Sequence, residues 1–387
     1  MRTRRAMATA VAAAALLVGC TAAPSPGDPP DDPAPQAAPP PSAAPGTLLD
    51  ARPVALPDEA LERLGATVTR VTYGSRSGLD GAPVRVSGVV IEPAGAPPPG
   101  GWPVVSFAHG TTGVADACAP SRSPGMLGQL PVVLPLVQRG YLVTATDYEG
   151  LGTPGPHPYL QPVSEGRSVI DAVHAARELV PAASNRWVAL GPSQGGQAAW
   201  AAAELAGGSG LEFLGAVALA PPTDLAALVD DVPYGLSPLQ RRFYPLVLYS
   251  LQLRHPQLDY ADYLAGPALA AMGELERSCI PAAFGQAPAS DFAPRSPAAL
   301  ARAKEWLEEF TLPRRPAAGP LFVAAGTGDD VVPVELVDAG VEAACELGDT
   351  VTYLRYPAGH PALPAAGDDA LDWIADRFAG NPASSTC

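Results

Sequence analysis

One serine lies in a Gly-x-Ser-x-Gly pattern, Gly-Pro-Ser-Gln-Gly at residues 191–195. An apolar run at 187–191 precedes it, and an alanine-rich helical pattern at 195–205 follows it. This context fits a nucleophile elbow, a tight strand-to-helix turn that needs glycines and exposes its serine. We therefore predict Ser193 as a nucleophile, with the helix dipole and the amide of Gln194 favouring an oxyanion.

The partners of this serine follow it in the chain. A serine hydroxyl is a weak nucleophile at neutral pH, so it needs a basic histidine and an acid that orients the histidine. Asp329 and Asp330 come after the apolar run 321–325, and His360 comes after the run 351–356. Asp329 is the preferred acid because it comes sooner after the strand, whereas Asp330 could face solvent or cap the next helix. Of the five histidines, His360 alone follows the last strand, so it is the predicted base.

A second oxyanion donor is expected in the loop His-Gly-Thr-Thr-Gly at 109–113, directly after the apolar run 104–108. We call this segment the oxyanion loop. Its small residues let backbone amides approach a substrate oxygen. The donor is the amide of Thr111 or of Thr112, and the sequence does not decide between them. His109 is expected to support the loop and to take no part in catalysis.

The remaining pattern places these loops in an α/β fold. The segments 67–73 and 83–92 alternate polar and apolar residues, as an antiparallel pair does. Short apolar runs typical of buried parallel strands follow at 104–108, 141–146, 187–191, 214–220, 321–325 and 351–356. Helical patterns lie between most of them. One runs to about 180, with Ser164 as its predicted N-cap and Glu165 near its positive end, and another follows the last run at 362–378. We predict a mainly parallel central sheet with helices on both faces.

A long segment without a central strand interrupts this alternation at about 221–316, which predicts an inserted helical cap. It is rich in aromatic and leucine residues, among them Phe243, Tyr244 and Tyr249. These could line an apolar tunnel for an acyl chain, or they could form the core of the cap itself. Chain-length preference does not follow from this pattern.

The segment Asp-Tyr-Glu-Gly-Leu-Gly at 147–152 follows the strand 141–146, so its side chains should lie at the same edge of the sheet. Asp147 or Tyr148 could line the pocket or brace the oxyanion loop. The favoured interpretation is structural, a glycine-rich turn held by local hydrogen bonds.

The N-terminal segment resembles an export signal. Three arginines precede an apolar run at 6–18 that is too short to span a bilayer, and Leu-Val-Gly-Cys at 17–20 resembles a lipobox. We predict a lipoprotein signal peptide at 1–19 and lipidation of Cys20. The alternative is a plain secretory signal cleaved near Ala22 or Ala23. Residues 20–50, rich in proline, form a predicted disordered tether, and 51–387 form the folded domain.

Charge and cysteine content restrict the partners. The chain has 24 Lys+Arg and 39 Asp+Glu residues, a net charge of −15, so nucleic acid is excluded as a partner. Removal of residues 1–19 takes away three arginines and no acid, which lowers the charge to −18. Such a domain would not bind an anionic membrane electrostatically, so Cys20 would supply the attachment. Four other cysteines, an even number, favour two disulfides with three possible pairings: Cys118, Cys279, Cys345 and Cys387. No motif indicates a metal, nucleotide or flavin, so no cofactor is expected.

Taken with the Gly-x-Ser-x-Gly motif, three further segments resemble the secretory lipase family of α/β-hydrolases, which includes fungal lipase A enzymes and exported actinobacterial proteins. They are Cys-Ala-Pro-Ser at 118–121, the segment 147–152, and Gly-Pro-His-Pro-Tyr-Leu at 155–160. The resemblance covers about 55–378. It implies a triad of Ser193, Asp329 and His360, and a helical cap over an acyl pocket. It also implies the disulfide pairs Cys118–Cys279 and Cys345–Cys387.

Two departures from the family pattern are visible. Pro192 stands where many hydrolases have histidine, at a position without a catalytic role. Thr112 lies near the place where fungal members have an acidic residue, which leaves open which group assists the oxyanion.

The sequence thus predicts an exported serine hydrolase, a lipase or carboxylesterase that acts on ester or lipid substrates through an acyl-enzyme. It would be anchored outside the cell membrane or secreted, and its oligomeric state is not predicted. One alternative is a peptidase or acyltransferase on the same scaffold. Another is a non-catalytic envelope binding protein, against which the intact triad argues.

Overall fold

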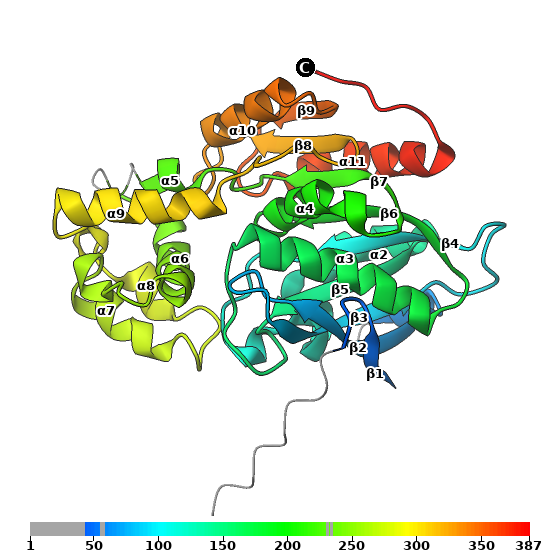
Figure 1. Ribbon diagram of the computed structural model, residues 1–387, viewed down its shortest axis with the longest axis horizontal. Coiled ribbons are helices and arrows are strands. Elements are labelled where there is room, and N and C mark those ends of the chain that lie inside the picture. The colour runs from blue at the N-terminus through cyan, green and yellow to red at the C-terminus, as the bar shows by residue number, and fades with distance from the viewer. Residues whose placement is uncertain (1–42, 55–58, 230–231, 233–234) are drawn as a thin grey trace, which may run out of the picture. The chain divides into compact units, whose positions relative to one another are not determined.

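The central element of the fold is a nine-stranded sheet with the order β1-β2-β3-β5-β4-β6-β7-β8-β9 (Figure 1). The computed structural model describes residues 43–54, 59–229, 232 and 235–387. The strands are β1 (Leu48–Pro53), β2 (Thr67–Arg76), β3 (Pro83–Glu92), β4 (Trp102–Ala108), β5 (Leu142–Glu149), β6 (Ala183–Pro192), β7 (Glu212–Leu219), β8 (Leu321–Gly326) and β9 (Val351–Tyr356). The pairs β1–β2, β2–β3 and β3–β5 are antiparallel, and the other pairs are parallel. The predicted α/β class with a mainly parallel sheet is confirmed.

Alternate residues of the central strands point to opposite faces of the sheet, and helices cover both. Val104 of β4 faces a core shared with α3 (Pro162–Leu179), α4 (Gln194–Leu205) and α10 (Val334–Glu346). Its neighbour Val105 faces a core shared with α1 (Glu59–Arg63), α2 (Leu130–Gln138) and α11 (Leu363–Ala379). The central strands are mostly apolar because neither face meets water.

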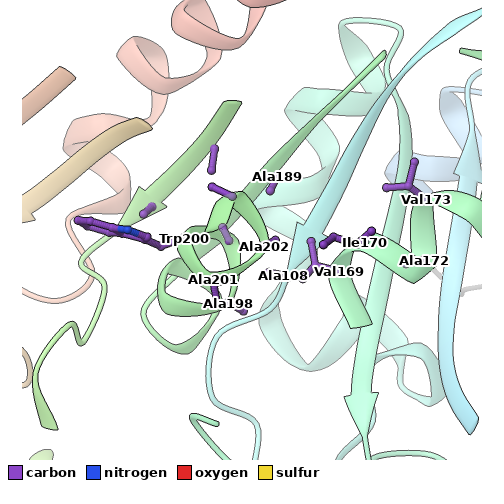
Figure 2. Packing of buried hydrophobic residues seen from close by; sticks show 14 of the residues in the cluster. Ala108, Val169, Ile170, Ala172, Val173, Ala189, Ala198, Trp200, Ala201 and Ala202 are labelled. Carbon is purple, nitrogen blue, oxygen red and sulfur yellow. The ribbon is translucent and has the colours of Figure 1, made fainter. Parts of the chain in front are cut away.

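Small side chains bring α3 and α4 close to the sheet and to each other (Figure 2). Ala198, Ala201 and Ala202 of α4 are fully or almost fully buried. A Cβ on Gly166 of α3 would lie 2.9 Å from the backbone of Ala201, so only glycine permits this approach. The close packing places the N-terminal ends of both helices beside the end of β6.

The start of α3 differs from the prediction. The helix begins at Pro162, and Gln161 is its N-cap, with the side-chain oxygen accepting a hydrogen bond from the Ser164 amide at 2.7 Å. The prediction of Ser164 as the N-cap was therefore wrong. Proline at the first helical position needs no N–H partner and has a suitable φ, which explains the earlier start.

The strand β1 was missed in the sequence. It starts at Leu48, inside the segment 20–50 that was expected to be a tether, and it pairs only with β2 at the edge of the sheet. Its residues are mostly exposed and include Asp50, Arg52 and Pro53, so it has no apolar pattern. The predicted signal peptide, Cys20 and most of the predicted tether lie outside the described residues.

Helices connect β7 to β8, and we call the segment 221–316 the cap; it lies to the left of the sheet in Figure 1. Its described residues contain helices and no strand: α5 (Leu225–Leu228), α6 (Gln240–Arg254), α7 (Gly266–Ala271), α8 (Ala282–Gln286) and α9 (Pro297–Leu307). The cap has its own core, in which Tyr263, Phe284 and Phe292 are buried. Many of its apolar residues thus serve packing.

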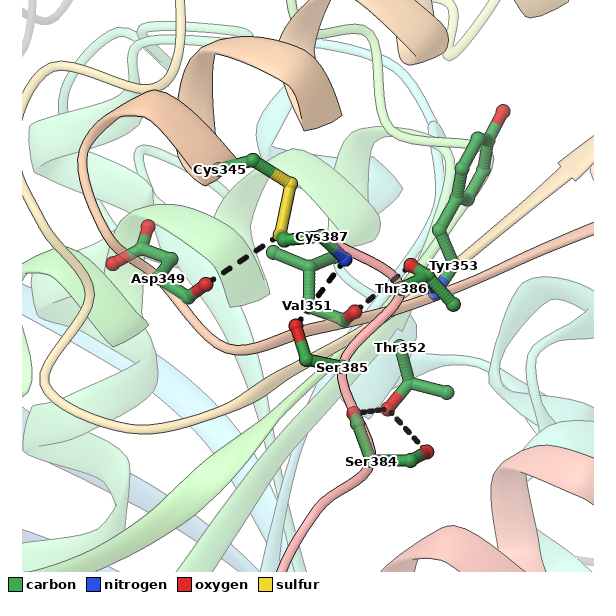
Figure 3. Close-up of a disulfide and its surroundings, with 9 residues drawn as sticks. All are labelled: Cys345, Asp349, Val351, Thr352, Tyr353, Ser384, Ser385, Thr386 and Cys387. Carbon is green, nitrogen blue, oxygen red and sulfur yellow. Dashed lines mark hydrogen bonds between the residues drawn. A yellow bond between two sulfur atoms is a disulfide. The ribbon is translucent and has the colours of Figure 1, made fainter.

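Two disulfides fix distant segments of the chain. Cys118, after β4, is bonded to Cys279 of the cap, and Cys345 of α10 is bonded to Cys387. Figure 3 shows the second bond, beside which Thr386 donates hydrogen bonds to the carbonyl of Val351. The C-terminal segment therefore covers the free edge of β9. Among the described residues, no helix combines the length and apolar character needed to cross a membrane.

Candidate active site

Ser193 stands at the turn between β6 and α4. Its backbone has φ 56° and ψ −120°, a strained conformation for a residue with a side chain, and its amide donates to the Leu219 carbonyl at 2.7 Å. A Cβ on Gly195 would collide with the Ala108 carbonyl, and one on Gly191 would collide with Gly195. The two glycines of the motif are required because β4, β6 and α4 approach one another at this point.

A histidine and a carboxylate continue from the serine in one chain of hydrogen bonds. Ser193 Oγ lies 2.8 Å from His360 Nε2, and His360 Nδ1 lies 2.7 Å from Asp329 Oδ2. Asp329 follows β8 and His360 follows β9, and parallel strands bring these ends to one edge of the sheet. The structure thus places the three predicted residues together. His360 can take a proton from Ser193 while Asp329 holds the opposite ring N–H.

Backbone amides hold the Asp329 carboxylate in place. Its Oδ1 accepts hydrogen bonds of 2.9 Å from the amides of both Val331 and Val332. Its side chain is 1% exposed. Asp330 is exposed, and its carbonyl accepts a hydrogen bond from Ser237. Asp329, and not Asp330, is therefore the carboxylate that orients His360.

The two threonines of the oxyanion loop differ in position. Thr111 lines two cavities that Ser193 also lines, and its hydroxyl lies 2.8 Å from the Tyr159 hydroxyl. Thr112 is buried and lines neither of these cavities. The amide of Gly110 already donates to the Gln129 side chain at 3.2 Å. These contacts favour Thr111 over Thr112 as the second donor.

Gln194 is the other predicted oxyanion donor. As the first residue of α4, it has a backbone N–H without an intrahelical acceptor, and it lines the cavity beside Ser193. The helix dipole adds partial positive charge at the same point. Anionic oxygen is favoured between this amide and the oxyanion loop.

Two buried side chains, His109 and Tyr148, contact the backbone of the oxyanion loop. His109 is 1% exposed, and its Nδ1 lies 2.7 Å from the Gly110 carbonyl. Tyr148 donates a hydrogen bond of 2.9 Å to the His109 carbonyl, and the two rings are 4.3 Å apart. Burial lowers the pKa of His109, which favours the neutral ring. His109 and Tyr148 thus brace the loop.

Asp147 ties two neighbouring segments together. It lies on β5, which extends three residues beyond the predicted end of that strand. Its carboxylate accepts hydrogen bonds from the hydroxyls of Ser87 and Ser121 and from the Ser121 amide. Burial raises its pKa, and these bonds oppose the shift. The interpretation of Asp147 as structural agrees with these contacts.

A second buried network lies behind Gln194, and the sequence did not predict it. The Gln194 side chain donates to Glu165 Oε1 at 2.7 Å and to His157 Nε2 at 3.1 Å, while His157 Nδ1 donates to the Glu149 carbonyl at 2.8 Å. Burial raises the pKa of Glu165 to about 8 and lowers that of His157 to about 3. The sequence held one indication of a role for His157, because this residue belongs to the segment 155–160 that resembles the secretory lipase family.

An apolar cavity extends from Ser193 into the cap, and we call it the cap cavity. Its enclosed volume is about 50 Å³. Besides Thr111, Ser193 and Gln194, its walls include Leu225, Phe243 and Val247. Its apolar lining suits an apolar chain attached to a carbonyl carbon at Ser193. Within the described part of the chain, no group of His, Cys, Asp or Glu residues is arranged to hold a metal ion.

The fold and the geometry of this site define an α/β-hydrolase. The chain belongs to the secretory lipase family, whose sequence pattern matches residues 126–386. The resemblance drawn from the sequence motifs is thereby confirmed. Family membership supports ester hydrolysis as the activity.

Solved structures agree on the fold. Candida antarctica lipase A in its closed state is 18% identical with a TM-score of 0.74, over 89% of this chain and 84% of that chain. The rice cell wall degrading esterase LipA from Xanthomonas oryzae is 22% identical with a TM-score of 0.68, over 87% and 98%. No curated protein matches the sequence significantly. At such low identities the structures establish the fold alone.

Proposed function

We propose that the chain is a serine hydrolase that cleaves carboxylic esters through an acyl-enzyme on Ser193. The observation that carries the proposal is the alignment of Ser193 Oγ, His360 and Asp329 through hydrogen bonds of 2.8 and 2.7 Å. This arrangement supports a nucleophile, a general base and an orienting acid in the required order.

The reaction proceeds in two halves. Ser193 Oγ attacks the ester carbonyl carbon while His360 Nε2 takes the hydroxyl proton, and the carbonyl oxygen becomes an oxyanion. The backbone amides of Gln194 and Thr111 stabilise that charge, and each such donor is typically worth about 10²–10³ in kcat. His360 then gives the proton to the leaving alcohol oxygen as the C–O bond breaks. Water attacks the acyl-enzyme with the same histidine as base, which releases the acid and frees Ser193.

The acyl group is assigned to the cap cavity. Thr111, Ser193 and Gln194 line its mouth, so a chain on the carbonyl carbon can extend directly among Leu225, Phe243 and Val247. Burial of its methylenes supports esters with an apolar acyl group as substrates.

Phosphonylation of the serine tests this function. A fluorophosphonate probe should label wild type and should not label Ser193→Ala, and wild type should release p-nitrophenol from p-nitrophenyl esters. Absence of labelling in folded wild type would refute the proposal. Activity confined to acetyl and butyryl esters would classify the enzyme as an esterase and not a lipase.

Export and anchoring form a separate part of the proposal. The lipobox-like sequence before Cys20 supports cleavage after residue 19 and lipidation of Cys20, with residues 21–42 as spacer. In a bacterial host, Cys20→Ala should move the protein from the membrane fraction to the soluble exported fraction. Wild type that is already soluble would contradict lipidation and favour the plain secretory signal.

A further inference from the structure

A second apolar cavity is lined by His360, which does not line the cap cavity. It runs between α2 and α11, and we call it the α2–α11 groove. Its enclosed volume is about 460 Å³. Val132 and Pro135 of α2, Ala370 and Leu371 of α11, and Leu190 and Leu219 of the sheet line it.

The groove reaches the reacting groups. A smaller opening lies over Ser193 and His360, and it shares four lining residues with the groove: Gly128, Val132, His360 and Pro361. A substrate bound at Ser193 can therefore extend into the groove past His360. Among the described residues that line the groove, His360 alone has an ionisable side chain, so the environment suits an uncharged alkyl group.

The stereochemistry of ester cleavage separates the two cavities. The oxyanion must point to the amides of Gln194 and Thr111, whereas the leaving oxygen must lie within reach of His360 Nε2, which protonates it. Gln194 and Thr111 line the cap cavity, and His360 does not. His360 lines the groove, and the oxyanion donors do not. The acyl and alcohol parts of an ester are thus directed to different cavities.

We propose that the α2–α11 groove binds the alkyl part of the leaving alcohol, so that the enzyme acts on esters in which both the acid and the alcohol are long and apolar. This inference rests on the proposed function. The cap cavity holds the acyl chain, and the groove holds the alcohol chain until His360 has protonated its oxygen.

Gly367 of α11 offers a substitution that fills the groove. It lines the groove, and a Cβ at this position meets no heavy atom within 4 Å. Gly367→Leu should fold well, because leucine is favoured over glycine in a helix. Gly208→Leu is the matched control, since Gly208 has equally open space and lines neither cavity.

Two isomeric esters distinguish the binding of the alcohol chain from the binding of the acid chain. Octyl butyrate has a long alcohol and a short acid, butyl octanoate has the reverse, and acid release by each can be titrated. Each buried methylene contributes about a factor of four to binding, so displacement of two methylenes from the groove should weaken binding of the alcohol chain about tenfold. We expect Gly367→Leu to lower the ratio of kcat/KM for octyl butyrate over butyl octanoate about tenfold, and Gly208→Leu to leave the ratio unchanged.

The outcomes are distinguishable. An unchanged ratio in Gly367→Leu, or a ratio that rises, would overturn the assignment of the groove to the alcohol. Wild type that is labelled at Ser193 but cleaves octyl butyrate no faster than ethyl butyrate would also overturn it. Wild type that is not labelled at all would refute the proposed function itself.

Discussion

The side-chain amide of Gln194 donates a 2.7 Å hydrogen bond to the fully buried carboxyl group of Glu165. The same Glu165 oxygen accepts a bond of 2.8 Å from the Leu160 amide. Glu165 thereby links the start of α3 to the first residue of α4, the helix that follows the nucleophile. Burial raises the pKa of Glu165 to about 8, so the carboxyl group is mostly protonated at neutral pH.

Glu165→Gln should remove a pH dependence of stability. The folded pKa of about 8 lies above the ordinary value of 4.5, so the stability linked to this proton is fully present below pH 4.5 and is lost as pH rises through 8. Glutamine stays neutral. The melting temperature of the variant should therefore rise relative to that of wild type as the pH is raised from 5 to 9.

The surrounding groups do not obscure this comparison. Burial lowers the pKa of His157, 4.0 Å away, to about 3, and burial raises the pKa of the nearby Tyr148 and Tyr159. In the folded protein none of them titrates between pH 5 and pH 9, and the titration of unfolded His157 near 6.5 is common to wild type and variant, so it cancels in the comparison. Thermal unfolding curves of wild type and variant that shift in parallel over this range would contradict the prediction.

The triad could be found in the sequence because each member comes within four residues of the end of a short apolar strand. Buried parallel strands are recognisable by their composition, and their carboxyl ends meet at one edge of the sheet. Ser193, Asp329 and His360 are therefore placed by local patterns alone. The network of Glu165, Gln194 and His157 was not predictable in this way, because it depends on the packing of α3 against α4. The sequence suggested for Glu165 only a favourable position in the helix dipole.

Asp329→Asn should reduce activity sharply. Asparagine can present an N–H instead of an oxygen to His360 Nδ1, which disturbs the tautomer that the base requires, and such a change costs about 10⁴-fold in kcat. Asp330→Asn is the matched control, because the Asp330 side chain is exposed and makes no contact with His360. Its kcat should stay within about twofold of wild type. Similar losses in both variants would argue against Asp329 as the orienting acid.

Tyr148→Phe should loosen the oxyanion loop. The variant keeps the ring contact with His109 but leaves the His109 carbonyl without the 2.9 Å bond, at a cost of about 1–3 kcal/mol. We expect kcat to fall about tenfold with little change in KM, because the loop amide acts mainly in the transition state.

A second buried tyrosine supplies the control for this prediction. Tyr263 donates a hydrogen bond of 3.1 Å to the Ala299 carbonyl in the core of the cap, and it does not line the cap cavity. Tyr263→Phe should lower the melting temperature by a similar amount and leave kcat near the wild-type value. If Tyr148→Phe lowers stability alone, Tyr148 does not position the loop.

Removal of the two disulfides one at a time should separate stability from activity. The loops closed by Cys118–Cys279 and Cys345–Cys387 span 161 and 42 residues, so loop entropy predicts losses of about 5 and about 4 kcal/mol. Only the first bond holds a segment against the oxyanion loop, where a Cβ on Gly113 would collide with the Cys279 backbone. The variants in which both cysteines of one pair are replaced by serine should therefore both have lower melting temperatures. At a temperature well below melting, kcat/KM should fall only for the Cys118–Cys279 pair. An equal fall for both pairs would show that Cys279 affects the loop through general stability, and not through its contact with Gly113.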